Sequence, residues 1–161
     1  MQNLPYYFIK RNIRKMNTLK TNPIVAGFTC LFLFAGCEDH KIIPQTELPP
    51  EVTAYILNNF KHTTIAQATQ EREGLGKTYD IVLADGIILE FNGKNEITEI
   101  KGNRAIPDGV VPQKIRTYVN QKYPGSTIKQ WQNEGNGQQV KLDNGIELKF
   151  NKAGDFQRID Q

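Results

Sequence analysis

The chain has 161 residues, with 20 basic and 17 acidic side chains and a formal net charge of +3. Five of the basic residues and none of the acidic ones lie in residues 1–37, so the remainder holds 15 basic against 17 acidic side chains, a net of −2. The positive total is therefore no evidence for nucleic-acid binding. Cys30 lies before Cys37, so removal of the residues that precede Cys37 leaves Cys37 without a partner for an internal disulfide.

Residues 1–37 are predicted to be a lipoprotein signal peptide. Pro23 to Ala35 is mostly apolar and has the length of a secretory signal core, too short to span a bilayer comfortably. It runs into Leu33-Phe34-Ala35-Gly36-Cys37, which resembles the lipobox of bacterial lipoproteins, although Phe34 stands where Leu is usual. We therefore expect lipid on Cys37, and an exported, membrane-anchored protein of the bacterial cell envelope that faces the periplasm or lies in the outer membrane. An ordinary signal peptide cut nearby and a membrane anchor are the alternatives, and Met16 is an alternative start.

Residues 38–47 (EDHKIIPQTE) are polar, have no periodicity and contain Pro44. We interpret them as a tether between the lipid and a folded domain. The 125 residues from Cys37 to the end of the given sequence are enough for one domain-sized core.

One supersecondary unit is used twice. Ile81 to Phe91 reads IVLADGIILEF, and Val140 to Phe150 reads VKLDNGIELKF, 59 residues later. Alternation places the apolar residues of each unit on one face only if the connecting loop has three residues, with Gly86 or Gly145 in a left-handed conformation. The following turns agree, because Asn95 and Gly154, which both tolerate positive φ, stand third in the loop.

Each unit is preceded by an amphipathic helix and a first strand. Apolar residues fall at helical spacing in residues 48–60 and again in 111–123. First strands are expected near 64–71 and 127–133, and last strands near 96–101 and 155–160, with a loop at 72–77 about four residues longer than its counterpart. The predicted fold is α+β, with tandem α-β-β-β-β repeats at 48–101 and 111–161, a linker at 102–110, and both helices on one face of an antiparallel sheet.

These motifs resemble those of the PepSY-like family of exported Bacteroidetes proteins, which is similar in fold to the β-lactamase inhibitor protein. The resemblance covers Leu48 to Gln161 and rests on Leu-Pro-x-x-Val before a helix, Tyr-Pro-Gly-Ser-Thr-Ile into a strand, Val-x-Leu-x-Asn-Gly-x-Glu-x-Lys-Phe-Asn and a closing Gly-Asp-Phe. It is looser in the first repeat, where Lys61-His62 replaces Pro-Gly. The resemblance implies export and a binding or inhibitory role without established catalytic residues, and it identifies no target.

Few residues in the sequence suggest catalysis or metal binding. His40 lies in the tether and His62 in a turn, without a second ligand type at metal spacing. Ser126, Asp85 and Asp143 also lie in predicted turns, where their conformational preferences explain them. We therefore predict no catalytic residues, no metal and no cofactor.

The face of the sheet away from the helices is the predicted partner-binding surface. Alternation places Val82 and Ile88 there in the first repeat, Lys141 and Glu147 in the second, and Trp131 in an unbulged strand. An exposed aromatic beside aliphatic residues is typical of an interaction hot spot. The alternative is that a bulge turns Trp131 inward. The predicted function is non-catalytic binding of an unknown protein or peptide, of which inhibition is one form. The other hypotheses are a structural subunit of an envelope complex, and an enzyme with unrecognised catalytic groups.

Overall fold

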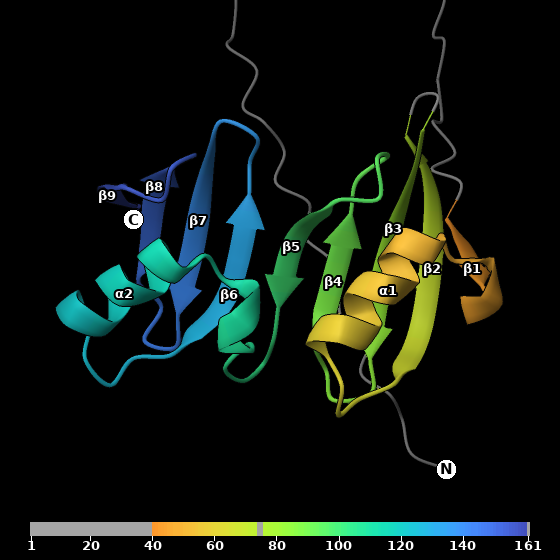
Figure 1. Ribbon diagram of the computed structural model, residues 1–161, viewed down its shortest axis with the longest axis horizontal. Helices are drawn as coiled ribbons and strands as arrows, with labels where there is room; N and C mark the ends of the chain where they lie inside the picture. The colour runs from red at the N-terminus through yellow and green to blue at the C-terminus, as the bar shows by residue number, and fades with distance from the viewer. Residues whose placement is uncertain (1–39, 74–75, 161) are drawn as a thin grey trace, which may run out of the picture. The chain divides into compact units, whose positions relative to one another are not determined.

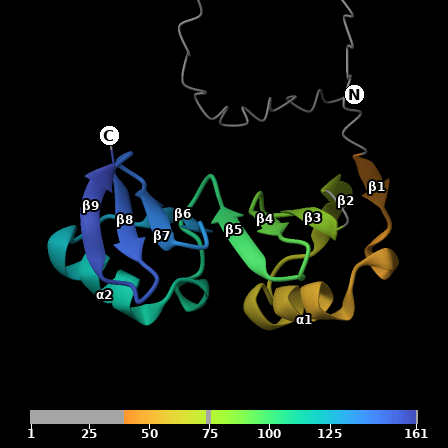
Figure 2. The ribbon, with the colours of Figure 1, turned by 90° about the horizontal axis from the view of Figure 1, so that it is seen from above.

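The computed structural model describes residues 40–73 and 76–160. Nine antiparallel strands form one open sheet in the order of the chain, and two helices lie on one side of it (Figures 1 and 2). The predicted α+β fold is confirmed. The strands are β1 Lys41–Ile43, β2 Ile65–Glu73, β3 Gly76–Leu83, β4 Ile88–Phe91, β5 Ile97–Lys101, β6 Ile128–Asn133, β7 Gly137–Leu142, β8 Glu147–Asn151 and β9 Phe156–Asp160. The α-helices are α1 Pro50–Asn59 and α2 Gln113–Lys122, and short 3-10 turns are η1 Gln45–Glu47 and η2 Asp108–Val110.

The turns of the repeated unit have the predicted three-residue loops. The Leu142 amide donates to the Ile146 carbonyl at 2.9 Å, and Gly145 has φ of 88°. In the first repeat the Leu83 amide donates to the Ile87 carbonyl at 2.8 Å. Each loop thus returns the chain with its apolar residues on the face from which it left. Asn95 and Gly154 also have positive φ, as predicted for the next turns.

Each helix is anchored to the sheet by the same aromatic contact. Tyr55 of α1 meets Phe91 edge-on with ring centroids 5.6 Å apart, and Tyr118 of α2 meets Phe150 edge-on at 5.5 Å. Pairs of this geometry add stability beyond the area they bury. Below these contacts lies a layer of fully buried aliphatic side chains from helices and strands, namely Val52, Ile81, Leu83, Leu89, Ile115, Val119, Leu142 and Leu148. The predicted helical stripes are therefore the core-facing surfaces.

The predicted tether is partly folded. Lys41–Ile43 forms β1, in which Ile43 lies opposite Ala68 of β2 and is 4% exposed. The sequence favours a tether here because three residues before a proline are too short to show a period. Pairing with the edge of β2 creates this strand, so the folded domain begins before residue 48.

The four extra residues near 72–77 lengthen the strands β2 and β3 and not the connection between them. β2 and β3 span nine and eight residues, whereas their counterparts β6 and β7 span six each. The hairpin that they form extends as far as the pair Glu73 and Gly76. The insertion therefore extends the first repeat's sheet, and the expectation of a simple longer loop was wrong.

Candidate binding face of the sheet

The candidate site is the face of the sheet opposite α1 and α2, which we call the open face (Figure 2). Strand alternation determines which side chains it holds, because every residue next to a core residue on a regular strand points the other way. In β3 the core residues Tyr79, Ile81 and Leu83 leave Asp80 and Val82 on the open face. No helix of the described segments packs there.

Four of the five predicted face residues lie in a single cross-strand row. Val82 stands opposite Ile88, and Lys141 stands opposite Glu147. Lys101 and Gln130 lie between the two pairs and pair with each other, so the row is Val82, Ile88, Lys101, Gln130, Lys141 and Glu147. We call it the mixed row. These four residues share the face on which strand alternation placed them, and their role in partner binding stays a prediction. The β5–β6 pairing joins the two repeats into one surface.

Trp131 is not on the open face. It is 6% exposed and stands between Ile100 of β5 and Val140 of β7 on the core side of the sheet. The register of β6 shifts between Ile128 and Gln130, so a bulge at Lys129 reverses the alternation beyond it. The prediction that Trp131 is exposed is therefore wrong. The structure contains the bulge that was the alternative.

A second row, which the sequence reasoning missed, lies beside the mixed row. Asp80 stands opposite Glu90, and Glu90 stands opposite Glu99. The same row continues through Gln132 and Gln139 to Lys149 and Arg158. We call this the acidic row, after its three carboxylates. The signal was available, since Asp80 and Glu90 lie two residues from Val82 and Ile88 and must share their face.

The charged side chains of the open face are arranged differently in the two repeats. In the second repeat Lys141 donates to Glu147 at 2.6 Å and Lys149 donates to Glu134 at 2.6 Å. In the first repeat the carboxylates of the acidic row face one another. Burial first, and then the charges of Glu90 and Glu71, raise the pKa of Asp80 to about 7. Burial also raises the pKa of Glu99, against the effect of Lys101.

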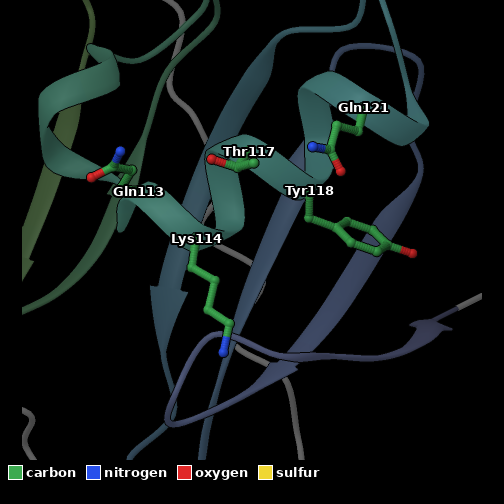
Figure 3. Close-up of a pocket in the computed structure, with 5 residues that line it drawn as sticks. All are labelled: Gln113, Lys114, Thr117, Tyr118 and Gln121. Carbon is green, nitrogen blue, oxygen red and sulfur yellow. The ribbon is translucent and has the colours of Figure 1, made fainter.

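Two hollows away from the open face are lined by few charged side chains. One, of about 540 Å³, is lined by five residues of α2 alone, and Figure 3 shows their side chains spread along the helix. Its charged residue, Lys114, is paired with Asp155 at 2.5 Å. The other, of about 510 Å³, lies at the turns around His62 and Asp85. Within residues 40–73 and 76–160, no group of three or more His, Cys, Asp or Glu side chains could hold a metal ion.

The turn residues that the sequence analysis considered for catalysis and set aside have partners in the turns, and the predicted lipidation site is not among the described residues. Asp85 pairs with Arg104, and the Asp143 carboxylate accepts a hydrogen bond from Thr127 at 3.1 Å, so both have turn-stabilising partners. Ser126 accepts from Asn144 at 3.3 Å in the same region. Cys37, the predicted lipidation site, and the signal peptide lie outside the described residues.

Comparison with known proteins agrees with this fold. The profile of a family described as "Putative beta-lactamase-inhibitor-like, PepSY-like" matches residues 35–75 and 77–158, which is more than half of the chain. No curated protein matches.

Solved structures from Bacteroides are similar along most of the chain. A "putative periplasmic protein" of Bacteroides vulgatus is 32% identical with a TM-score of 0.72, and the match covers 78% of this chain and 100% of that one. A "putative calcium-regulated periplasmic protein" of Bacteroides thetaiotaomicron is 28% identical with a TM-score of 0.72, covering 76% and 98%. A second Bacteroides vulgatus protein, "of unknown function", is 30% identical with a TM-score of 0.71, covering 76% and 99%. The chain therefore belongs to the PepSY-like, beta-lactamase-inhibitor-like family.

Proposed function

We propose that this protein binds a protein or peptide partner through the open face of its sheet, without catalysis. The observation that carries the proposal is the open face, on which the mixed row and the acidic row lie side by side. Val82 and Ile88 supply half-buried apolar area, and the charge of the acidic row beside them would orient a bound partner. An interface commonly combines such an apolar patch with a polar surround.

The charge of the first repeat favours a partner segment that carries Lys or Arg. Asp80, Glu90 and Glu99 are cross-strand neighbours of like charge that repel when they are ionised, and Glu99 also accepts a hydrogen bond from Gln130 at 2.7 Å. A cationic side chain placed between them relieves that repulsion, and such complementarity mainly sets specificity and association rate. The family's description as inhibitor-like supports a binding role at the level of the fold alone. No β-lactamase is implied as the target.

Calcium regulation is not extended to this chain. The words belong to the Bacteroides thetaiotaomicron relative. In the described part of this chain the acidic side chains form no group that could hold a metal ion.

Capture from an envelope extract tests the binding face. The bait is the full-length protein, compared with a Val82→Ser/Ile88→Ser variant and an Asp80→Asn/Glu90→Gln variant. Leu57→Ser is the matched control, because Leu57 is 67% exposed on α1 and away from the sheet. We expect both face variants to lose at least tenfold of the captured partner, with the acidic variant's loss growing smaller at high salt.

The comparison has a clear contrary result. If all variants, including Leu57→Ser, capture the same partner equally, the open face is not the binding surface. A partner recovered only as part of a stable membrane assembly would favour the structural-subunit hypothesis.

The protein is further proposed to be an envelope lipoprotein anchored through Cys37. The signal-like sequence that ends at Cys37 supports this, as do relatives described as periplasmic. No helix of the described segments is long and apolar enough to cross a membrane. Cys37→Ala should abolish metabolic lipid labelling and release the protein from membranes, because it removes the residue that carries the acyl chains of the proposed anchor. Unchanged membrane retention of the variant, together with an unlabelled parent, contradicts the anchor.

A further inference from the structure

β9 is an edge strand of the sheet, and its rim carries large apolar side chains. The strand order of the described residues ends at β9 (Figure 2). Phe156 and Ile159 stand opposite the core residues Phe150 and Leu148, so both point to the side of the sheet that holds α2. Tyr118 of α2 stacks on Phe156 with ring centroids 4.6 Å apart. Phe156 is nonetheless 37% exposed and Ile159 49% exposed, so the core side of the sheet is incompletely covered at this edge.

The first repeat shows what covers the position equivalent to Ile159. Ile100 of β5 is that equivalent, since each of the two residues stands opposite the core leucine of the preceding strand. Ile100 is 0% exposed, because the next strand, β6, places Trp131 opposite it. A further antiparallel strand beside β9 would bury Ile159 in the same way.

The backbone of β9 is oriented to accept such a strand at Ile159. Hydrogen-bonded and non-hydrogen-bonded pairs alternate along an antiparallel ladder. The Leu142 amide donates to the Ile146 carbonyl, so two pairs along the same register Leu148 bonds to Val140 of β7. Leu148 therefore directs its backbone groups away from β9, and the N–H and C=O of Ile159 point away from β8. Such outward groups at a sheet edge are a template for pairing with another strand.

We propose that β9 pairs antiparallel with β9 of a second copy of this chain, with Ile159 of the two copies opposite each other on a two-fold axis. Self-pairing of this kind closes a dimer with one repeated contact. In this register Arg158 of each copy lies opposite Asp160 of the other, on the open face. Opposite charges in direct cross-strand positions attract, and the symmetry creates two such pairs.

The charges of β9 leave room for these pairs. Asp160 Oδ1 lies 3.7 Å from Arg158 Nε, and Asp160 Oδ2 lies 3.8 Å from Lys149 Nζ, both longer than a hydrogen bond. The cross-strand neighbour of Asp160 within the chain is Glu147, which has the same charge. Arg158 of the second copy places an opposite charge on the other side of Asp160.

The other edge of the sheet is less suited to pairing. β1 has three residues, carries the exposed Lys41 and is followed by Pro44. Short length, lysine and proline are features by which edge strands avoid pairing. β9 has five residues and no proline, and it exposes Phe156 and Ile159. The pairing therefore joins β9 to β9, and not β9 to β1, which would build an open chain of subunits.

Sedimentation velocity of the full-length protein in detergent, with a reductant to prevent disulfides, tests the dimer. The contact is one strand pair, at the small end of specific interfaces, so we expect a dimer that dissociates on dilution. Arg158→Asp and Asp160→Arg each create two like-charge contacts across the axis, and each should weaken association about tenfold. The double variant Arg158→Asp/Asp160→Arg reverses both charges and should restore association.

A mixture of the two single variants tests the register. One Arg158→Asp chain and one Asp160→Arg chain have opposite charges at both contacts, so native mass spectrometry should show the mixed dimer in excess over either homodimer. Ile159→Lys should abolish association. Ile42→Lys is the matched control, because Ile42 is 69% exposed on β1 at the other edge, and it should leave association unchanged.

Four results overturn the proposal. The first is a wild-type protein that stays monomeric up to about 0.5 mM. The second is single charge variants that associate like the wild type. The third is a double variant, or a mixture of the single variants, that does not regain association. The fourth is an Ile42→Lys variant that weakens association as much as Ile159→Lys.

Discussion

The indole Nε1 of Trp131 donates a hydrogen bond of 2.9 Å to the Gln138 side-chain oxygen on the neighbouring strand. Gln138 in turn donates to the Lys152 carbonyl at 3.2 Å. A buried tryptophan needs a partner for its N–H, and this chain of two bonds supplies one within the core. In the first repeat the positions of Trp131 and Gln138 are held by Ala68 and Tyr79, so the polar pair belongs to the second repeat alone.

Replacing Trp131 should therefore affect stability rather than partner binding. Trp131→Ala removes a large buried side chain and leaves Gln138 without its donor, and should lower the free energy of unfolding by about 3–5 kcal/mol. Gln132→Ala, on the open face next to it, should cost less than about 1 kcal/mol. Urea unfolding measures both. The native protein should show blue-shifted tryptophan emission that a soluble quencher hardly reduces, and red-shifted, readily quenched emission would contradict the buried position.

The sequence predicted which side chains of β3, β4, β7 and β8 point to the core. The three-residue loops, each with glycine at its third position, determine the register of the two strands in each hairpin. Gly86 and Gly145 carry that information. The face of Trp131 could not be obtained in this way, since the bulge at Lys129 adds one residue without a characteristic sequence. β1 was missed for another reason: Ile43 finds its place against Ala68 only when β2 is already formed, 25 residues away. The same alternation gives the face on which Asp80 and Glu90 lie. That the carboxylates of the acidic row are neighbours depends on the order of the strands in the sheet.

Gly145 should be required for its backbone conformation. Its φ is 88°, and nothing lies within 4 Å of an added Cβ, so a substitution meets backbone strain and no steric clash. Gly145→Val should destabilise the fold by about 1–3 kcal/mol. Lys141→Val, on the open face of β7, should cost much less, because its ion pair with Glu147 is half exposed and the strand favours β-branched residues. Similar melting shifts for the two variants would mean that the assigned loop geometry is wrong.

Ile42 and Ile43 provide a matched test of whether β1 is part of the domain. Ile43 is 4% exposed against Ala68, whereas Ile42 is 69% exposed on the other side of the strand. Ile43→Ala should lower the free energy of unfolding by about 2–4 kcal/mol, and Ile42→Ala by less than about 0.5 kcal/mol. Chemical denaturation at pH 6 compares them. If the two variants are equally stable, residues 41–43 behave as the tether that the sequence suggested.

Asp80 should make the fold less stable as the pH rises. Its pKa is about 7 in the folded protein against an ordinary value of 3.8, so between these values the folded state binds a proton that the unfolded state has lost. The free energy of unfolding therefore falls with increasing pH across this window and levels off above pH 7. Asp80→Asn removes the charge, and should raise stability at pH 8 by about 1–2 kcal/mol after allowance for partial solvent screening, with little effect at pH 4.

Asp143→Asn is the control and should not change the slope of stability against pH between pH 5 and pH 8, because the pKa of Asp143 is lowered and its contribution is lost only in acid. Urea unfolding followed by Trp131 fluorescence at several pH values measures all three proteins. A wild-type stability that rises steadily from pH 5 to pH 8, or an Asp80→Asn variant that is less stable at pH 8, would show that Asp80 is stabilised as an anion.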